Sequence, residues 1–200
     1  MTGSFKGLTQ EEQILLQGCR AGDQEAWLAL FRSYSPDIGR FLKGMLRQSS
    51  EIDDLVQQVL MKFLSSLDRF KGDSSLRTWL LGIARNVALR EIRTTSRRNH
   101  YVQKYAESVE RTQGNLEERL VARHELDHIL HIIDGLDVPF REVWLLREMS
   151  GCSARDVADI LEVEVATVRT RHFRARKQLM ERLQKESVKT SLRLVKGVEK

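Results

Sequence analysis

The sequence predicts an all-α protein built from two small helical domains joined by a linker, the second containing a helix-turn-helix. Apolar residues recur at helical spacing along most of the 200 residues, and no segment shows the alternation of apolar and polar residues that is typical of a strand. The chain is 41% hydrophobic and 30% charged and holds only two prolines, which suits one or two helical domains with true cores.

Helix start signals mark the elements in order. Thr9 and Glu12 have the spacing of a capping box at the start of the first helix, and Ser50 is placed to cap a later one. A loop, RFKGDSS, then leads into a long helix from Leu76. The helices expected before the C-terminal motif are 9–20, 23–34, 36–47, 51–65, 76–93, 116–136 and 140–149.

A polar stretch at 94–115 divides the chain. It contains few large aliphatic residues and has the composition of a flexible linker. The predicted organisation is a first domain at 1–95, a linker at 96–115, a second domain at 116–185 and a basic, flexible tail at 186–200.

The stretch ATVRTRHFRARKQL, Ala166 to Leu179, carries five positive charges within nine residues and no acid. At 100° per residue it divides into two faces. The packing stripe consists of Val168, His172, Ala175 and Leu179, and the opposite side carries Ala166, Arg169, Thr170, Phe173, Arg174 and Lys177. One face can therefore pack while the other contacts a partner.

A short helix precedes this one. Ser153 and Asp156 have capping-box spacing, and apolar residues follow at helical intervals. The turn at 162–165 is too short to separate the two helices, so the pair predicts a helix-turn-helix whose second helix enters the major groove of DNA. Arginine there can read guanine, and other basic side chains position the protein on phosphates. An ordinary amphipathic surface helix is the alternative.

The net charge of +5 hides a segregation along the chain. From residue 66 to 104 there are nine basic and three acidic residues, which gives 9 − 3 = +6. From 105 to 142 there are four basic and nine acidic residues, which gives 4 − 9 = −5. Two basic surfaces on either side of an acidic middle indicate two separate DNA contacts.

Other classes of protein find little support. No apolar run reaches membrane-spanning length, and the N-terminus lacks the hydrophobic centre of a signal peptide, so we expect no membrane insertion and a cytoplasmic location. Cys19 and Cys152 are isolated, without the paired spacing of a zinc or redox site. Both are interpreted as small buried hydrophobic residues.

Three blocks of the chain resemble the extracytoplasmic-function (ECF) group of bacterial RNA polymerase sigma factors. In order they are EIDDLVQQVLMKF at 51–63, RFKGDSSLRTWLLGIARNVALREIR at 69–93, and LDVPFREVWLLREMSGCSARDVADILEVEVATVRTRHFRARKQL at 136–179. The resemblance implies a σ2 domain that binds core RNA polymerase and recognises and melts the −10 element, and a σ4 domain that recognises the −35 element. It implies transcription initiation rather than enzymatic catalysis, with no cofactor and no metal.

The first block is suited to holding polymerase. By resemblance, its helix docks on the coiled coil of the largest polymerase subunit. The candidate polymerase-binding residues are Asp53, Asp54, Gln57 and Gln58. Many relatives have Glu at the position of Gln58, so one expected charge is missing. A solvated helix face is the alternative.

The second block is suited to promoter opening. Flipping a base out of the duplex costs a few kcal/mol, so a preformed pocket and a cationic path for the separated strand favour the open state. The residues that the resemblance assigns to −10 recognition and melting are Phe70, Lys71, Gly72, Asp73, Ser74, Ser75, Arg77, Asn86, Arg90 and Arg93. Trp79 has the spacing of a core residue, and core packing is its favoured interpretation.

The third block contains the helix-turn-helix. The resemblance assigns −35 contacts to Thr167, Arg169, Thr170, Phe173, Arg174 and Lys177. His172 lies on the packing stripe, and we interpret it as a core or boundary residue rather than a base reader.

Two alternatives remain from the sequence. The stretch from His124 to His128 matches the H-E-x-x-H motif of zinc metalloproteases, with His131 one turn further on, yet the three histidines share a face opposite the apolar stripe and should point to water. An ordinary helix-turn-helix regulator would share the C-terminal motif without needing the first two blocks. The favoured partners are core RNA polymerase, promoter DNA and an anti-sigma factor.

Overall fold

The structure is a computed structural model that describes residues 8–46, 51–70, 72–105 and 130–197, with the backbone alone at 97–105 and 186–197. Within these ranges every regular element is helical, which confirms the predicted all-α class. The elements are α1 (Gln10–Arg20), α2 (Gln24–Met45), α3 (Ile52–Ser66), the 3-10 turn η1 (Leu67–Arg69), α4 (Leu76–Tyr105), α6 (Val138–Trp144), the π-helix η2 (Leu145–Met149), α7 (Ala154–Leu161) and α8 (Val165–Gly197).

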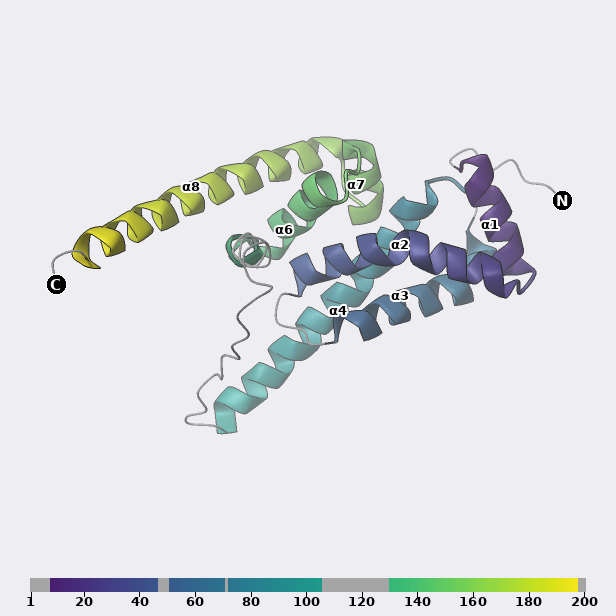
Figure 1. The fold of residues 1–200 in the computed structure, drawn as a ribbon, viewed down its shortest axis with the longest axis horizontal. Coiled ribbons are helices and arrows are strands. Elements are labelled where there is room, and N and C mark those ends of the chain that lie inside the picture. The colour runs from purple at the N-terminus through teal and green to yellow at the C-terminus, as the bar shows by residue number, and fades with distance from the viewer. Residues whose placement is uncertain (1–7, 47–50, 71, 106–129, 198–200) are drawn as a thin grey trace.

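The four helices α1 to α4 form an N-terminal bundle. Helix α2 packs against α1, α3 and α4, and α3 packs against α4 (Figure 1). The centre of the bundle is filled by fully buried side chains, among them Leu16, Phe41 and Phe63. Removing this apolar surface from water is the main force that holds the four helices together.

Helix α2 is continuous, although the sequence predicted two helices that meet at Pro36. Proline inside a helix removes a hydrogen bond and costs about 3 kcal/mol. Buried residues nevertheless continue on one face before and after Pro36, with Leu30 on one side and Ile38, Phe41 and Met45 on the other. Packing of this uninterrupted face against the bundle offsets the cost.

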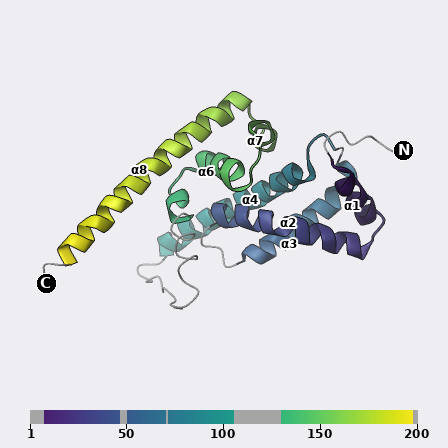
Figure 2. The ribbon, with the colours of Figure 1, turned by 45° about the horizontal axis from the view of Figure 1, so that its top comes forward.

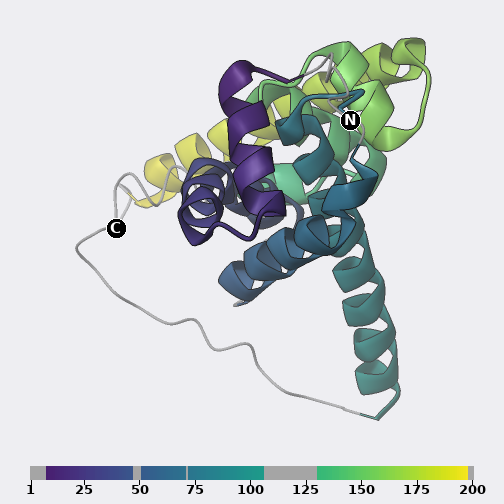
Figure 3. The ribbon, with the colours of Figure 1, turned by 90° about the vertical axis from the view of Figure 1, so that its right-hand side faces the viewer.

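Helices α4 and α8 both extend past the ends that the sequence predicted. Helix α4 continues from the expected end at 93 to Tyr105, and α8 continues through the expected flexible tail to Gly197. Neither extension contains glycine or proline, the residues that most often end helices, until Gly197 is reached. Both ends project away from the packed elements (Figures 1 and 3).

The C-terminal unit consists of a helical end at 130–134 together with α6, η2, α7 and α8. Its most extensive helix contact is between α6 and α8. Helix α7 packs against the N-terminal part of α8 (Figure 2). Val143, Leu146, Val157 and Val168 are buried between these helices. The unit therefore has an apolar centre of its own.

The two units pack directly against each other. Helix α4 contacts α7, and α2 contacts both α6 and η2. Arg85 Nε donates to Glu142 Oε1 at 2.8 Å, and Glu142 is buried. Burial raises the pKa of the Glu142 carboxyl, although Arg85 opposes this shift. Gly44 leaves room for Leu145, since a Cβ at Gly44 would overlap the leucine side chain.

Candidate nucleic-acid interface

The predicted helix-turn-helix is present and built as expected. Asp156 N donates to Ser153 Oγ at 3.1 Å and Ser153 N donates to Asp156 Oδ2 at 2.8 Å, so the capping box at the start of α7 is complete. Helix α7 ends at Leu161 and is followed by the C-cap residue Glu162, whose φ of 55° places it in the left-handed region. This left-handed residue reverses the direction of the chain, and α8 begins three residues later at Val165.

The inner face of α8 holds the helix against its unit. Val168, Ala175 and Leu179 are buried, as their spacing predicted. His172 is half-buried, and its Nε2 lies 2.7 Å from Glu148 Oε1 in η2. The interpretation of His172 as a boundary residue is therefore confirmed, and it faces the protein rather than a DNA groove.

The outer face of α8 is exposed to solvent. Phe173 is 70% exposed, the highest value among the exposed large apolar side chains of the described residues. Arg169, Thr170, Arg174 and Lys177 surround it and are exposed, while Thr167 is half-buried. The structure thus brings the six predicted residues of this helix onto one basic face with an aromatic side chain at its centre.

Helix α4 presents a second exposed polar face. Asn86, Arg90 and Arg93 are all exposed, and their spacing of four and three residues places them on one side of the helix. Arg77 is not part of this group, because nine residues separate it from Asn86, a rotation of half a turn. Its guanidinium instead pairs with Asp37 of α2, with Nη2 2.5 Å from Oδ2.

The loop before α4 is anchored at both ends. Phe70 is buried, and its ring stacks on Trp79 with centroids 4.5 Å apart and an interplanar angle of 19°. At the other end Ser75 Oγ accepts a hydrogen bond from Thr78 N at 3.0 Å. The sequence analysis placed Phe70 among the residues that bind the −10 element. Its ring is instead buried against Trp79 and is not available to stack on a base.

Between these anchors lies the tip of the loop. Gly72 has a φ of 76°, a conformation that favours glycine, and Asp73 is exposed. Ser74 and Ser75 are half-buried, and Lys71 lies outside the described residues. Trp79 also packs edge-on against Phe63 at 5.2 Å, which supports its interpretation as a core residue.

The outer face of α3 carries the candidate polymerase-binding residues. Asp53, Asp54, Gln57 and Gln58 are all exposed. On the opposite side of the same helix Leu55, Val59 and Phe63 are buried in the bundle. Helix α3 is therefore amphipathic, with its polar side open to a partner.

Two contacts could not be anticipated from local sequence. Arg85 of α4 forms an ion pair with Glu142 of the other unit. Arg20, at the end of α1, donates from Nη2 to the carbonyl oxygens of Leu67 and Phe70, each at 3.3 Å. The partners lie about fifty positions apart in the chain, so no spacing rule indicates them.

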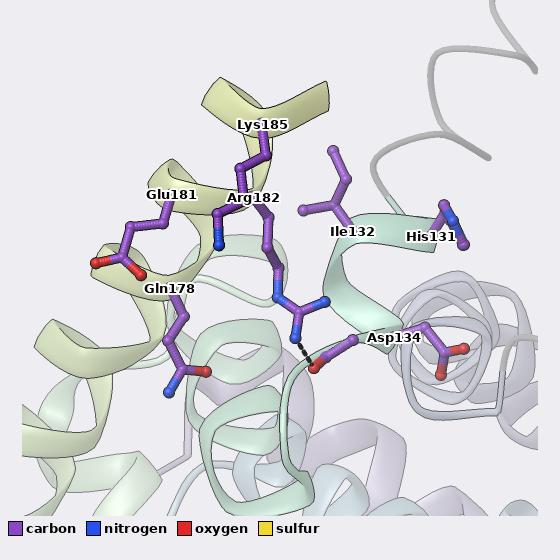
Figure 4. A pocket seen from close by; sticks show the side chains of 8 residues that line it. His131, Ile132, Asp134, Gln178, Glu181, Arg182 and Lys185 are labelled. Carbon is purple, nitrogen blue, oxygen red and sulfur yellow. Dashed lines mark hydrogen bonds between the residues drawn. The ribbon is translucent and has the colours of Figure 1, made fainter. Parts of the chain in front are cut away.

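No metal site is found in the described residues, where no three His, Cys, Asp or Glu side chains are grouped to hold an ion. His124 and His128 lie outside the described residues. His131 is exposed, beside a hollow between residues 131–135 and α8 (Figure 4). The hollow is lined by charges of both signs, and Arg182 crosses it to donate to the carbonyl oxygen of Gly135 at 2.5 Å.

The two cysteines are buried, as predicted. Burial raises the pKa of the Cys152 thiol to about 11, and burial with the nearby Asp23 carboxylate raises the pKa of Cys19. Among the described helices, none combines the length and the apolar character needed to cross a bilayer.

Comparison with known proteins shows to which family this protein belongs. Residues 30–98 match the model of Sigma-70 region 2, and residues 126–179 match Sigma-70, region 4. The RNA polymerase sigma-H factor of Pseudomonas aeruginosa is 32% identical over 186 residues, which cover 88% of this chain and 96% of the relative. The chain belongs to the ECF group of the sigma-70 family.

Other relatives agree. The ECF RNA polymerase sigma-E factor of Escherichia coli is 32% identical over 181 residues, covering 86% of this chain and 94% of that protein. A solved structure of the sigma factor RpoE in complex with the anti-sigma factor NepR from Bartonella quintana superposes with a TM-score of 0.63 at 28% identity, over 78% of this chain and 95% of that one. These matches confirm the prediction that the protein is a sigma factor that acts in promoter recognition and transcription initiation.

The fold is shared more widely. CnrH, solved in complex with the cytosolic domain of CnrY, has a TM-score of 0.64 at 24% identity, over 86% of this chain and 96% of that one. At this identity the likeness supports the fold alone. The first helix, α1, begins well before the stretch that matches region 2.

Proposed function

We propose that this sigma factor binds core RNA polymerase through the outer face of α3 and reads two promoter elements with separate helices. The outer face of α8 reads the −35 element in duplex DNA. The outer face of α4 and the loop before it bind the −10 element as its strands separate. The N-terminal bundle and the C-terminal unit then serve as the σ2 and σ4 domains, corresponding to 1–95 and 116–185.

The observation that carries this proposal is the exposure of three polar faces whose reverse sides are buried. On α8, exposed Arg169 and Arg174 lie opposite buried Val168 and Ala175. Phe173 is exposed among these charges. A side chain of this kind suits apolar contact with a thymine methyl group beside arginines that bind guanine.

The exposed side chains of α4 suit binding of a DNA strand that has separated from its partner. The candidate cations Arg90 and Arg93 can neutralise phosphates of a separated strand, and Asn86 offers both a donor and an acceptor to a base edge. Along the helix axis Asn86 lies about 15 Å beyond Leu76, where the loop ends. The loop and Asn86 therefore serve different nucleotides of one strand, and the tip of the loop at 72–74 receives the unpaired base.

Two further points belong to the proposal. An anti-sigma factor that binds this protein is expected, since the RpoE relative was solved in complex with one. The protein acts in the cytoplasm, where core polymerase works, and breaks or forms no covalent bond itself. No cofactor is required, because strand opening draws on binding energy from protein–DNA contacts.

The proposal is tested by measuring specific DNA binding with and without core polymerase. Promoter fragments are selected from genomic DNA by the protein alone, by core enzyme alone and by the two together. Selection of shared upstream elements by the mixture alone supports the sigma mechanism. Tight selection of a palindrome by the protein alone contradicts it and indicates an ordinary helix-turn-helix regulator.

A further inference from the structure

Helix α1 has no role in the surfaces described so far, yet it is firmly part of the bundle. Leu16 and Cys19 are buried against α2, and a capping box of Thr9 and Glu12 fixes its start. At the α1–α2 corner a Cβ on Gly18 would stand 2.6 Å from the Ala26 side chain, so the two helices approach closely. The last residue of α1, Arg20, is therefore held at a defined position.

Arg20 reaches the segment that leads into the loop. Its Nη2 donates to the carbonyl oxygen of Leu67 and to that of Phe70, each at 3.3 Å. These two carbonyls stand at the ends of the η1 turn, which is itself closed by Phe70 N donating to Leu67 O at 3.2 Å. One guanidinium nitrogen thus fixes both ends of the turn from the outside.

The side chain of Phe70 is fixed as well. It stacks on Trp79, which packs edge-on against Phe63, which in turn meets Trp27 edge-on at 6.3 Å. The main chain at Phe70 is therefore held by Arg20 and its ring by the aromatic row. At the other end of the loop, Ser75 is fixed by Thr78, whose backbone N donates to Ser75 Oγ.

We infer that Arg20 is a positioning residue for strand capture, because it fixes the position and direction of the main chain at Phe70, where the loop begins. A loop held in its binding geometry loses less conformational freedom when it receives a base than a loop that must first become ordered. The inference rests on the proposed role of the loop in binding the −10 strand. In this inference Arg20 acts through the carbonyl oxygens of Leu67 and Phe70 and not by binding DNA.

The experiment uses the full chain bound to core polymerase and compares three variants with the native protein. Arg20→Gln removes the charge and shortens the side chain. Arg20→Lys keeps the charge and an ammonium group that can donate a hydrogen bond to one of the two carbonyl oxygens. Arg32→Gln is the matched control, since Arg32 is exposed on α2. The probes are a single-stranded oligonucleotide with the non-template −10 sequence and a duplex that carries the −35 element alone.

Arg20→Gln is expected to weaken binding of the single strand about tenfold and to leave −35 duplex binding within twofold. Arg20→Lys should restore most of the loss, and Arg32→Gln should change neither. Unchanged single-strand binding by Arg20→Gln overturns the inference. An equal loss on both probes, with a large fall in melting temperature, also overturns it, because it indicates a purely structural role.

A loop variant, Asp73→Ala, separates this inference from the proposed function. Loss of single-strand binding by Asp73→Ala but not by Arg20→Gln leaves the loop assignment standing and removes the role of Arg20. If neither variant changes single-strand binding while promoter selection by the holoenzyme persists, the loop is not the capture site and the inference fails with it. If the holoenzyme selects no promoter, the proposed function itself fails.

Discussion

At the scale of single residues, the buried pair of Arg85 and Glu142 has the clearest energetic consequence. Breaking a buried ion pair by removing one partner costs about 3–5 kcal/mol, because the other charge is left without compensation. Burial raises the pKa of Glu142 above its ordinary value of 4.5 despite the opposing effect of Arg85, so this carboxyl takes up a proton more readily in the folded than in the unfolded protein. Glu142 therefore makes folding dependent on pH.

The variant Glu142→Gln tests this dependence. A group with a raised pKa in the folded state contributes stability that is present below its unfolded pKa and is lost as pH rises through its folded pKa. The free energy of unfolding of the native protein minus that of Glu142→Gln should therefore increase as pH falls from 7 to 4, by about 1.4 kcal/mol for a pKa difference of one. Urea unfolding of both proteins across this range measures the difference, and a constant difference would refute the assignment.

Arg174 tests base reading on α8. If it binds a guanine edge, Arg174→Ala should reduce binding of holoenzyme to its promoter about 5- to 150-fold, which corresponds to about 1–3 kcal/mol, and reduce binding to random DNA much less. Lys177→Ala is the comparison, because loss of a phosphate contact weakens both by a similar factor. Equal losses for Arg174→Ala on both DNAs would make Arg174 a phosphate contact only.

At the scale of elements, the order of the helices and the faces of α3 and α8 could be predicted from the sequence. Both depend on periodicity and on local signals such as the Ser153 capping box. The long extensions of α4 and α8 could not be placed, because a polar segment without glycine or proline is compatible with either a linker or a solvated helix. Contacts such as that of Arg20 with Phe70 depend on tertiary packing between residues distant in the chain, so no local sequence pattern indicates them.

The capping box of α7 offers a test at this scale. Ser153→Ala removes the hydroxyl that accepts from Asp156 N and should cost about 0.5–2 kcal/mol of stability. Since α7 supports α8, binding of the −35 duplex should weaken as well. Thr9→Ala removes the equivalent cap from α1 and should lower stability without affecting −35 binding. Similar effects of both variants on duplex binding would argue against a specific role of α7 in holding α8.

At the scale of the whole molecule, the proposed promoter contacts require the two units to separate. The centres of the −35 and −10 elements lie about 25 base pairs apart, which is about 85 Å at 3.4 Å per base pair of straight duplex. In the structure Thr78 of α4 donates to Asp156 of α7 at 3.4 Å, and Arg141 Nη1 donates to the carbonyl oxygen of Met45 at 3.1 Å. If α8 binds the −35 element and the loop before α4 binds the −10 element, as proposed, we expect this interface to open when a promoter is bound.

Energy transfer between two dyes measures this opening. Leu28→Cys on α2 and Met180→Cys on α8 place reactive thiols at exposed positions. The native Cys19 and Cys152 are buried with raised pKa values and should label slowly. Transfer efficiency should be high in the free protein and fall when core polymerase and promoter DNA are added. Unchanged efficiency in the promoter complex would mean that the two units stay packed.

The most direct test of the whole account is transcription in vitro by core polymerase on genomic promoter fragments, with and without this protein. A sigma factor that reads two promoter elements should produce transcripts that depend on the protein and start downstream of two shared sequence elements. Arg174→Ala and Asn86→Ala should reduce these transcripts through different elements. Absence of any dependent transcript, with folded protein free of bound partners, would contradict the account.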